Sequence, residues 1–524
     1  MKVSPGQRLF SDALQALKAL QDAGRTVLKS EELNRQQREV LVKNGFLRQV
    51  VRGWYMPSRP DEAPGDTTPW HAALKNFVRE YCDGRFDELW HAAPEYSVAL
   101  HVGATVPPRQ IVVWSPKASN GILQLPDTFS LLDYRRDIDP RRVELVSGVR
   151  VMPLSLALIK VPEVFFRGSV RDARIALHQV DPSDLLRDLV EGGHSAIAGR
   201  LAGALRAVGR GQVADEILST MRAVGYAVTE SNPFAAPLPE LRLGDAKSPY
   251  VLRMRLMWQE MRGAVLEAFP GEPGPPTDVA GFMDSVEEAY ASDAYHSLSI
   301  EGYRVSDDLI RRVAGGGWSP DAVPADLEAK NALAARGYWL AHNRVKETMV
   351  RIFSGANPGA AFRADHAGWY QSLWEPCVAA GILRPVDLAG YRSHQVFIKN
   401  AQHVPPSKDA VREMMPELCA LLQEEESAAV RAVLGHFLFV YIHPYMDGNG
   451  RLGRFLMNAM LGSGGYTWTV IRVERRAEYL DALDAASSRG DIAPLAAFIR
   501  SCMEADSGGA DSGGRGPVVS LLSL

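Results

Sequence analysis

Cysteine is scarce in this sequence. The four cysteines lie far apart, at Cys82, Cys377, Cys419 and Cys502. No Cys-x-x-Cys pair and no Cys/His cluster occurs, so we expect no zinc site. A disulfide framework is equally unexpected in a chain of 524 residues, because such frameworks belong mainly to small secreted domains.

Long apolar runs are also missing. No run reaches the roughly 18 residues that a membrane span needs. The first fifteen residues lack the apolar core of a signal peptide. We therefore expect a soluble cytoplasmic protein that has no membrane partner.

The chain has no overall excess of positive charge. Its net charge of -4 argues against a wholly basic nucleic-acid-binding protein but leaves room for a local basic module. With 46% apolar and 23% charged residues, the composition is that of an ordinary globular protein. The length predicts two to four domains.

Residues 1–59 are such a basic module, with 11 Lys and Arg against 5 Asp and Glu. Helical patterns cover residues 11–23 and 31–44; Ser30 is the expected cap of the second helix, and Gly45 follows its end. Residues 46–55 are typical of two short strands that turn near Arg52 and Gly53. This order predicts a winged helix-turn-helix.

Such a module could bind DNA, with the helix over 31–44 as the candidate for the major groove. Phosphate contacts would come from five cations: Arg35, Arg38, Lys43, Arg48 and Arg52. The alternative is a small packing module with a solvated basic face, and the sequence leaves both open.

The rest of the chain divides at two Pro-rich linkers, 57–65 and 232–250. Between them, residues 68–230 predict a mixed α/β domain without a catalytic constellation. Its expected strands lie at 110–114 and 149–152, and its expected helices at 201–208 and 214–224. Residues 250–503 are almost wholly helical, apart from a small hairpin near 396–406. The Gly/Ser-rich tail, 506–524, is expected to be disordered.

One segment combines the residue types that phosphate chemistry needs. It runs from His443 to Arg454, between helices expected at 428–442 and 451–461. Pro444 discourages His443 from continuing the first helix, so the imidazole should lie at the helix end, where it can take a proton. Asp447 offers hard carboxylate oxygen that suits Mg²⁺.

The rest of the segment suits a polyphosphate. Gly448, Asn449 and Gly450 let backbone N–H groups converge on an anion at a helix N-terminus. Arg451 and Arg454 share one face of that helix. Each residue alone has an ordinary structural explanation as a turn, a helix end or a solvated face. Together they predict attack by a hydroxyl on a nucleotide phosphate.

The segment resembles the Fic family motif, HPFxDGNGRxxR, at every fixed position except Tyr445, which stands where the family has Phe. We expect the Tyr445 ring to anchor the loop and its hydroxyl to reach solvent or a partner. The resemblance covers 250–503. It implies an all-α Fic core with a small β-hairpin flap, matched by 390–398 and 404–406, that aligns the target side chain by adding a strand. It leaves a homodimer open.

The resemblance also implies a role for each residue. His443 would deprotonate a Ser, Thr or Tyr hydroxyl of a target protein, and AMP would pass from ATP to that oxygen with release of pyrophosphate. Asp447 would hold Mg²⁺. The nucleotide would be bound by the anion hole and two clamps: Gly448, Asn449 and Gly450, with Arg451 on the β-phosphate and Arg454 on the γ-phosphate.

A second motif lies upstream. Ser297 and Glu301 are four residues apart on one helical face, and Gly302 is placed to end that helix. This pattern resembles the Fic inhibitory motif, [S/T]xxxE[G/N]. It implies a glutamate that occupies the Arg454 guanidinium, so that ATP binds with its γ-phosphate misplaced. The alternative is an ordinary surface carboxylate.

Three functions follow from the sequence. The first is an adenylyltransferase that Glu301 inhibits. The second keeps the fold but removes AMP, or transfers UMP or phosphate. The third is a DNA-binding regulator or antitoxin-like protein whose Fic core senses nucleotide, because residues 25–115 loosely resemble the antitoxins of abortive-infection systems.

Overall fold

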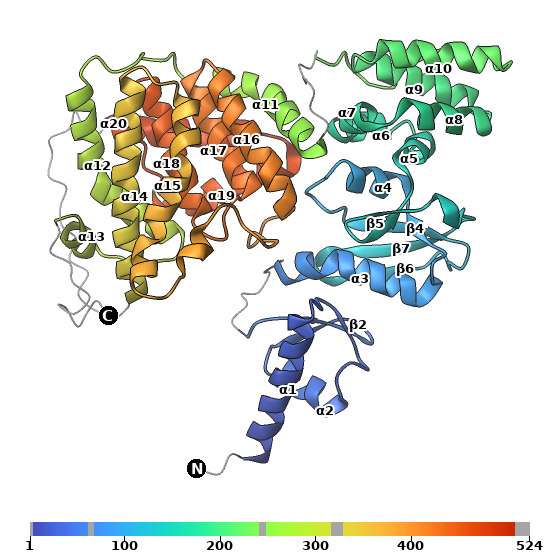
Figure 1. Ribbon diagram of the computed structural model, residues 1–524, viewed down its shortest axis with the longest axis horizontal. Coiled ribbons are helices and arrows are strands. Elements are labelled where there is room, and N and C mark those ends of the chain that lie inside the picture. Colours follow the sequence, from blue (N-terminus) through green and yellow to red (C-terminus); the bar gives the residue numbers. More distant parts are fainter. Residues whose placement is uncertain (1–3, 61–65, 67, 240–247, 316–328, 509–524) are drawn as a thin grey trace. The chain divides into compact units, whose positions relative to one another are not determined.

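The computed structural model describes residues 4–60, 66, 68–239, 248–315 and 329–508. The chain forms two compact units, Met1–Arg253 with Val396–Pro405, and Met254–Gln395 with Pro406–Leu524 (Figure 1). Most of the tail expected at 506–524, and parts of both expected linkers, lie outside the described residues. None of the helices in the described ranges is long and apolar enough to span a membrane.

The first unit begins with two helices and a small antiparallel sheet of order β1-β3-β2. These elements are α1 Pro5–Asp22, β1 Leu28–Lys29, α2 Arg35–Lys43, β2 Leu47–Val51 and β3 Trp54–Pro57. The expected start of the second helix at Ser30 is wrong. Asn34 caps it instead, because its side chain accepts from Gln37 N at 2.9 Å while the Gln37 side chain accepts from Asn34 N at 3.1 Å. The winged-helix interpretation stays a prediction.

Three of the five cations proposed for DNA phosphates make contacts inside the protein. Arg38 donates to the backbone carbonyls of Ser30 and Leu33. Arg48 lies 3.5 Å from Asp127, and Arg35 pairs with Glu39 at 2.7 Å on the helix surface. DNA binding therefore also stays a prediction, and it would rest on fewer free cations than the composition indicates.

The remainder of the first unit is an α/β region followed by helices. A four-stranded sheet of order β4-β5-β7-β6 has one parallel pair, β5 with β7, and β8 and β9 form a separate hairpin. The strands predicted at 110–114 and 149–152 are present as β5 and β9. The elements are α3 Thr68–Phe86, β4 His91–Ala92, α4 Pro94–His101, β5 Gln110–Ser115, β6 Ile122–Gln124, β7 Ser130–Arg135, β8 Glu144–Val146, β9 Val149–Val151, α5 Leu154–Lys160, α6 Phe165–Gly168, α7 Val170–Gln179, α8 Pro182–Glu191, α9 Ser195–Ala207 and α10 Gly211–Ala223.

The helical second unit is built around a group of packed helices, α14 to α18 (Figure 1). In α17 every residue except Val440 is buried, and α18 is buried along nearly all of its length. The loop between them is therefore held at both ends by the core. The elements are α11 Pro249–Ala268, α12 Val279–Ile300, α13 Asp307–Ala314, α14 Ala329–Phe353, α15 Pro358–Ala379, α16 Lys408–Glu424, α17 Ala428–Ile442, α18 Asn449–Ser463, α19 Arg476–Asp484 and α20 Ala493–Gly508.

The expected β-hairpin flap is wrong. Residues 390–407 contain no strand, and 396–398 do not pair with 404–406. Pro405 and Pro406 have no N–H group to donate to a ladder. The carbonyl of Pro406 accepts instead from the Arg392 guanidinium. The segment turns at Asn400, whose φ is 60°.

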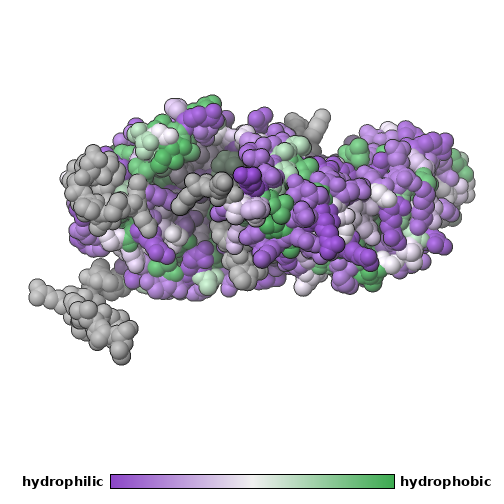
Figure 2. Space-filling model, turned by 90° about the horizontal axis from the view of Figure 1, so that it is seen from below, coloured by the Kyte–Doolittle hydropathy of each residue, from purple (hydrophilic) through white to green (hydrophobic). Residues whose placement is uncertain are grey.

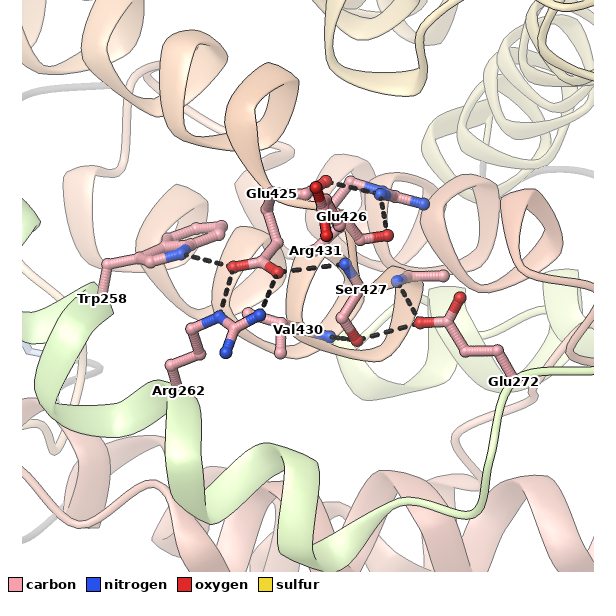
Figure 3. A network of polar contacts seen from close by, with 9 residues as sticks. Trp258, Arg262, Glu272, Glu425, Glu426, Ser427, Val430 and Arg431 are labelled. Atoms are coloured by element: carbon pink, nitrogen blue, oxygen red, sulfur yellow. Dashed lines mark hydrogen bonds and ion pairs between the residues drawn. The ribbon is translucent and has the colours of Figure 1, made fainter. Parts of the chain in front are cut away.

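The start of α17 is fixed by a polar network (Figure 3). Glu425 precedes α17 and accepts from Trp258 Nε1 at 3.1 Å and from Arg262 Nε and Nη2 at 2.9 and 3.0 Å. It also accepts from the backbone N–H of Ser427, the residue that caps α17. Burial would raise the pKa of Glu425, but these donors hold it below its ordinary value. The network ties α11 to α17.

Apolar side chains are concentrated in the interiors of the units. On the face drawn in Figure 2, hydrophilic residues predominate and apolar ones form small separate groups. Exposed large apolar residues such as Ile122, Leu145 and Ile382 are scattered along the sequence. Isolated residues of this kind are normal on protein surfaces and need no partner.

Glu425→Ala should destabilise the second unit. The change removes four hydrogen bonds from a carboxylate that is 5% exposed. We expect a loss of about 2–4 kcal/mol and a fall of about 4–10 °C in the thermal midpoint. Glu347→Ala is the control, because its pair with Arg344 is largely exposed. Equal midpoints for the two variants would contradict the prediction.

Candidate active site

His443 lies where α17 ends, as Pro444 predicts. Its φ of 53° is left-handed, and its N–H still donates to Phe439 O at 3.0 Å. Nδ1 lies 3.2 Å from Val440 O, so an imidazole protonated at Nδ1 donates there and leaves Nε2 as the acceptor. Burial lowers the pKa of His443 to about 4, against the opposing effect of Glu301 and Asp447. The ring is therefore neutral at pH 7.

Arg392 holds the backbone around His443. Its Nε donates to His443 O at 2.8 Å, and its backbone N–H donates to Pro444 O at 2.9 Å. The guanidinium is buried and also donates to His394 O and Pro406 O. A left-handed backbone conformation is costly for a residue with a side chain. These hydrogen bonds stabilise that conformation at His443.

The loop is closed by Asn449. Its Oδ1 accepts from Tyr445 N at 2.9 Å, and its Nδ2 donates to Tyr445 O at 2.8 Å. The Tyr445 ring stacks on Tyr370 with centroids 3.8 Å apart, so it anchors the loop as expected. Its hydroxyl does not reach solvent or a partner: it is buried and makes no hydrogen bond with the described residues. The amide of Asn449 is thus used for loop shape, which leaves its backbone N–H for an anion.

The N-terminus of α18 has no side-chain cap. Its N-cap is Gly448, in the left-handed region with a φ of 88°. The N–H groups of the first turn, from Asn449 to Arg451, have no partner within the helix, so they are available to an anion. A side chain at Gly450 would collide with the Glu301 carboxylate, so glycine is needed there for the two to approach.

Arg451 is buried but lacks hydrogen bonds. Its residue surface is 1% exposed, and Nε, Nη1 and Nη2 have no hydrogen-bond partner among the described residues. The guanidinium lies between the rings of Tyr303 and Trp374, 5.1 Å from each centroid. The Asp447 carboxylate is 3.7 Å from Nη2. A buried cation with unmet donors is costly, and an anionic ligand would satisfy it.

Arg454, one turn later, is bound by the C-terminal end of α12 and its cap residue. Its Nε donates to Ser297 Oγ at 2.8 Å, and its Nη2 donates to Ser297 O at 3.0 Å and to Glu301 Oε1 at 2.8 Å. Burial would raise the pKa of Glu301, but Arg454 and Arg451 hold it below its ordinary value. Burial would likewise lower the pKa of Arg454, and Glu301 raises it above the ordinary value. The pair is charged on both sides.

Glu301 reaches Arg454 because α12 stops at that point. Ile300 is the last helical residue, Glu301 is the C-cap, and Gly302 follows with a φ of 86°. The backbone N–H groups of Gly302 and Tyr303 donate to Ser299 O and Leu298 O and close the helix end.

Asp447 lies at the exposed tip of the loop. Its side chain is 62% exposed, and Oδ1 accepts from Gly448 N at 2.6 Å. Its other oxygen faces solvent and the Arg451 guanidinium, beside the unpaired N–H groups of α18. A hard carboxylate next to an anion site fits a Mg²⁺ ion bound together with a phosphate.

Sequence reasoning missed Tyr303, Trp374 and the role of Arg392. Tyr303 lies two residues after Glu301, and this proximity in the sequence could have identified it as a residue of the site. Trp374, on α15, has no motif that links it to the loop. A cleft of about 660 Å³, lined by residues of α14, α15 and 385–389, lies on another face of α15 and contains none of the expected site residues.

Residues 367–461 match the model of the Fic/DOC family. This region of the chain is therefore a Fic/DOC family domain. "Protein adenylyltransferase Fic" of Nematostella vectensis is 29% identical over 224 residues, which cover 42% of this chain and 48% of that protein. Its counterpart in Culex quinquefasciatus is 30% identical over 229 residues, 43% of this chain and 42% of that protein. The chain thus spans less than half the length of these two curated relatives.

A solved structure, Fic-1 (residues 134–508) of C. elegans, is also similar. It has 19% sequence identity and a TM-score of 0.36, and the match covers 65% of this chain and 97% of that one.

The titration of His443 tests the electrostatics of the site. We expect its imidazole to titrate near pH 4, because burial opposes the charged form. An unfolded histidine titrates near 6.5, so the unfolded chain binds this proton first and His443 lowers stability as the pH falls from about 6.5 to 4. Long-range ¹H–¹⁵N NMR of the labelled protein measures the pKa, and His443→Ala assigns the signal. Titration near 6.5 would contradict this description.

Proposed function

We propose that this Fic protein is a protein adenylyltransferase that moves AMP from ATP to a Ser, Thr or Tyr hydroxyl of a target protein. The observation that carries the proposal is Arg451, a buried cation with no hydrogen bond to the described residues, at an uncapped helix N-terminus that follows His443. Such a combination supports a polyphosphate ligand with a base beside it. The curated relatives named as adenylyltransferases support ATP as that ligand.

The chemistry of the transfer needs a neutral base. Nε2 of His443 takes the proton of the target hydroxyl, the hydroxyl oxygen attacks the α-phosphorus, and the bond to the β-phosphate oxygen breaks. Pyrophosphate leaves, and AMP stays on the target. The N–H groups of Asn449 and Gly450 stabilise the charge that grows on the phosphate, and Arg451 binds the β-phosphate.

Asp447 would hold Mg²⁺ in this reaction. The ion would neutralise charge on the polyphosphate and on the leaving pyrophosphate. The exposed Oδ2 of Asp447, beside the phosphate-binding donors, supports this assignment.

We further propose that Glu301 inhibits the transfer. Arg454 is the group that would bind the γ-phosphate, and it already has three hydrogen bonds to Ser297 and Glu301. The γ-phosphate and Glu301 then compete for one guanidinium. When Glu301 keeps Arg454, the γ-phosphate is displaced, and the α-phosphate then does not face His443.

Glu301→Gly should therefore activate the protein. The Arg454–Glu301 pair is only partly exposed. Its loss should therefore make binding of the γ-phosphate to Arg454 more favourable by at least about 1.4 kcal/mol, a factor of about ten in affinity. We expect automodification from ATP to rise at least about tenfold. Mass spectrometry of a lysate treated with ATP and this variant gives the transferred mass and the acceptor together.

Asp308→Asn is the matched control, because this carboxylate on α13 is exposed and pairs with Arg312. Equal labelling by wild type and Glu301→Gly would remove the inhibition. A transferred mass of UMP or phosphate, or release of AMP from a modified target, would replace the reaction with another within the fold.

His443→Ala, made in the Glu301→Gly background, should abolish transfer and leave ATP binding within about twofold. The imidazole acts on the hydroxyl proton, whereas the phosphates are held by α18. Calorimetry measures the binding, and incorporation of labelled AMP measures the transfer. Continued labelling by this variant would show that the base is another group.

A further inference from the structure

Trp374 has a buried donor that no described residue uses. Its Nε1 is enclosed, and no hydrogen-bond acceptor among the described residues reaches it. An unpaired indole N–H inside a protein costs about 1–3 kcal/mol, and buried indoles usually find a partner. The other indole on α15, that of the buried Trp369, follows that rule and donates to Thr348 Oγ1 at 3.2 Å.

The unused donor borders the uncapped N-terminus of α18. A methyl group built on Gly448 would lie 3.3 Å from Trp374 Nε1 and 3.5 Å from Arg451 Nη2. The indole N–H and the guanidinium therefore face the same side of Gly448. Both groups are donors, neither has a hydrogen-bond acceptor within the described residues, and both adjoin the free N–H groups of the helix.

The ring of Trp374 also orients Arg451. Its ring centroid lies 5.1 Å from the Arg451 Cζ, the same distance as the Tyr303 centroid. The faces of the two rings attract the guanidinium through cation–π contacts and accept no hydrogen bond from its edge, so its N–H groups stay available. Hydrogen bonds from Arg451 and from the indole can then reach one anionic group together.

We propose that Trp374 is a polyphosphate-binding residue, whose Nε1–H donates to the phosphate that Arg451 binds. This inference rests on the proposed function for the identity of the ligand, a nucleoside di- or triphosphate with its β-phosphate at Arg451. It adds to the family motif a donor from α15, a helix that is distant from α18 in the sequence.

Trp374→Phe tests the donor, because phenylalanine keeps an aromatic face for Arg451 and lacks the N–H; the smaller ring is a change that the Trp369→Phe control shares. Calorimetry with ADP and with AMP, on the otherwise unchanged full chain, separates the phosphates. We expect the affinity for ADP to fall about tenfold, the loss of one hydrogen bond to a charged acceptor. The affinity for AMP, which has no β-phosphate, should stay within about twofold. Inorganic pyrophosphate is a second probe that should follow ADP.

Trp369→Phe is the matched control. It also removes a buried indole N–H from α15, but that N–H donates to Thr348 and not to the loop. This variant should bind ADP as the wild type does. Unchanged ADP affinity in Trp374→Phe, or equal losses for AMP and ADP, would overturn the proposal.

The same experiment separates this inference from the proposed function. Binding is measured without any transfer. If Glu301→Gly labels protein with AMP while Trp374→Phe binds ADP normally, the transfer stands and the donor is excluded. If ADP binding depends on Trp374 and no AMP is transferred, the donor stands and the reaction is excluded.

Discussion

A buried guanidinium group needs acceptors, and the two arginines of α18 meet this need in opposite ways. Arg454 is bound inside the protein by Ser297 and Glu301 through three hydrogen bonds, one of which is also an ion pair with Glu301. Arg451, one turn earlier, lies between two aromatic rings and has no hydrogen bond to any described residue. The Arg454 guanidinium thus has protein acceptors, whereas the Arg451 guanidinium keeps its donors for an anionic ligand. The proposed activity, its proposed inhibition and the proposed role of Trp374 all follow from this difference in hydrogen bonding between the two guanidinium groups.

The geometry of the loop depends on groups that do not take part in the chemistry. The Asn449 amide bridges the backbone of Tyr445, Arg392 donates to the carbonyl of His443, and the Tyr445 ring stacks on Tyr370. At the other end of α17, Glu425 and Ser427 fix its start (Figure 3). A catalytic group must be held close to its productive position, and here the core helices hold both ends of the segment.

How much the sequence could predict depends on how local each feature is. The loop could be predicted because its residues are contiguous and because Gly and Pro restrict the backbone there; the helix expected at 428–442 is α17 with the same bounds. The start of α2 could not be predicted from caps alone, because Ser30 and Asn34 are both good cap residues, and the hydrogen bond from Gln37 N to Asn34 Oδ1 decides between them. The flap was predicted as a hairpin from its apolar pattern, whereas Pro405 and Pro406 cannot donate to a ladder. Trp374 and Arg392 act through contacts between distant parts of the chain, which no spacing in the sequence reveals.

The distribution of exposure along the loop has a consequence for how this site can diverge. Tyr445, Asn449 and Arg451 are buried, whereas Met446 and Asp447 face solvent. Replacement of one of these three buried residues would disturb both the packing of the loop and the geometry of the site. Replacement of Met446 or Asp447 would leave the packing of the loop unchanged. Evolution of new preferences for metal or acceptor would therefore begin at the tip of the loop, while its base stays unchanged.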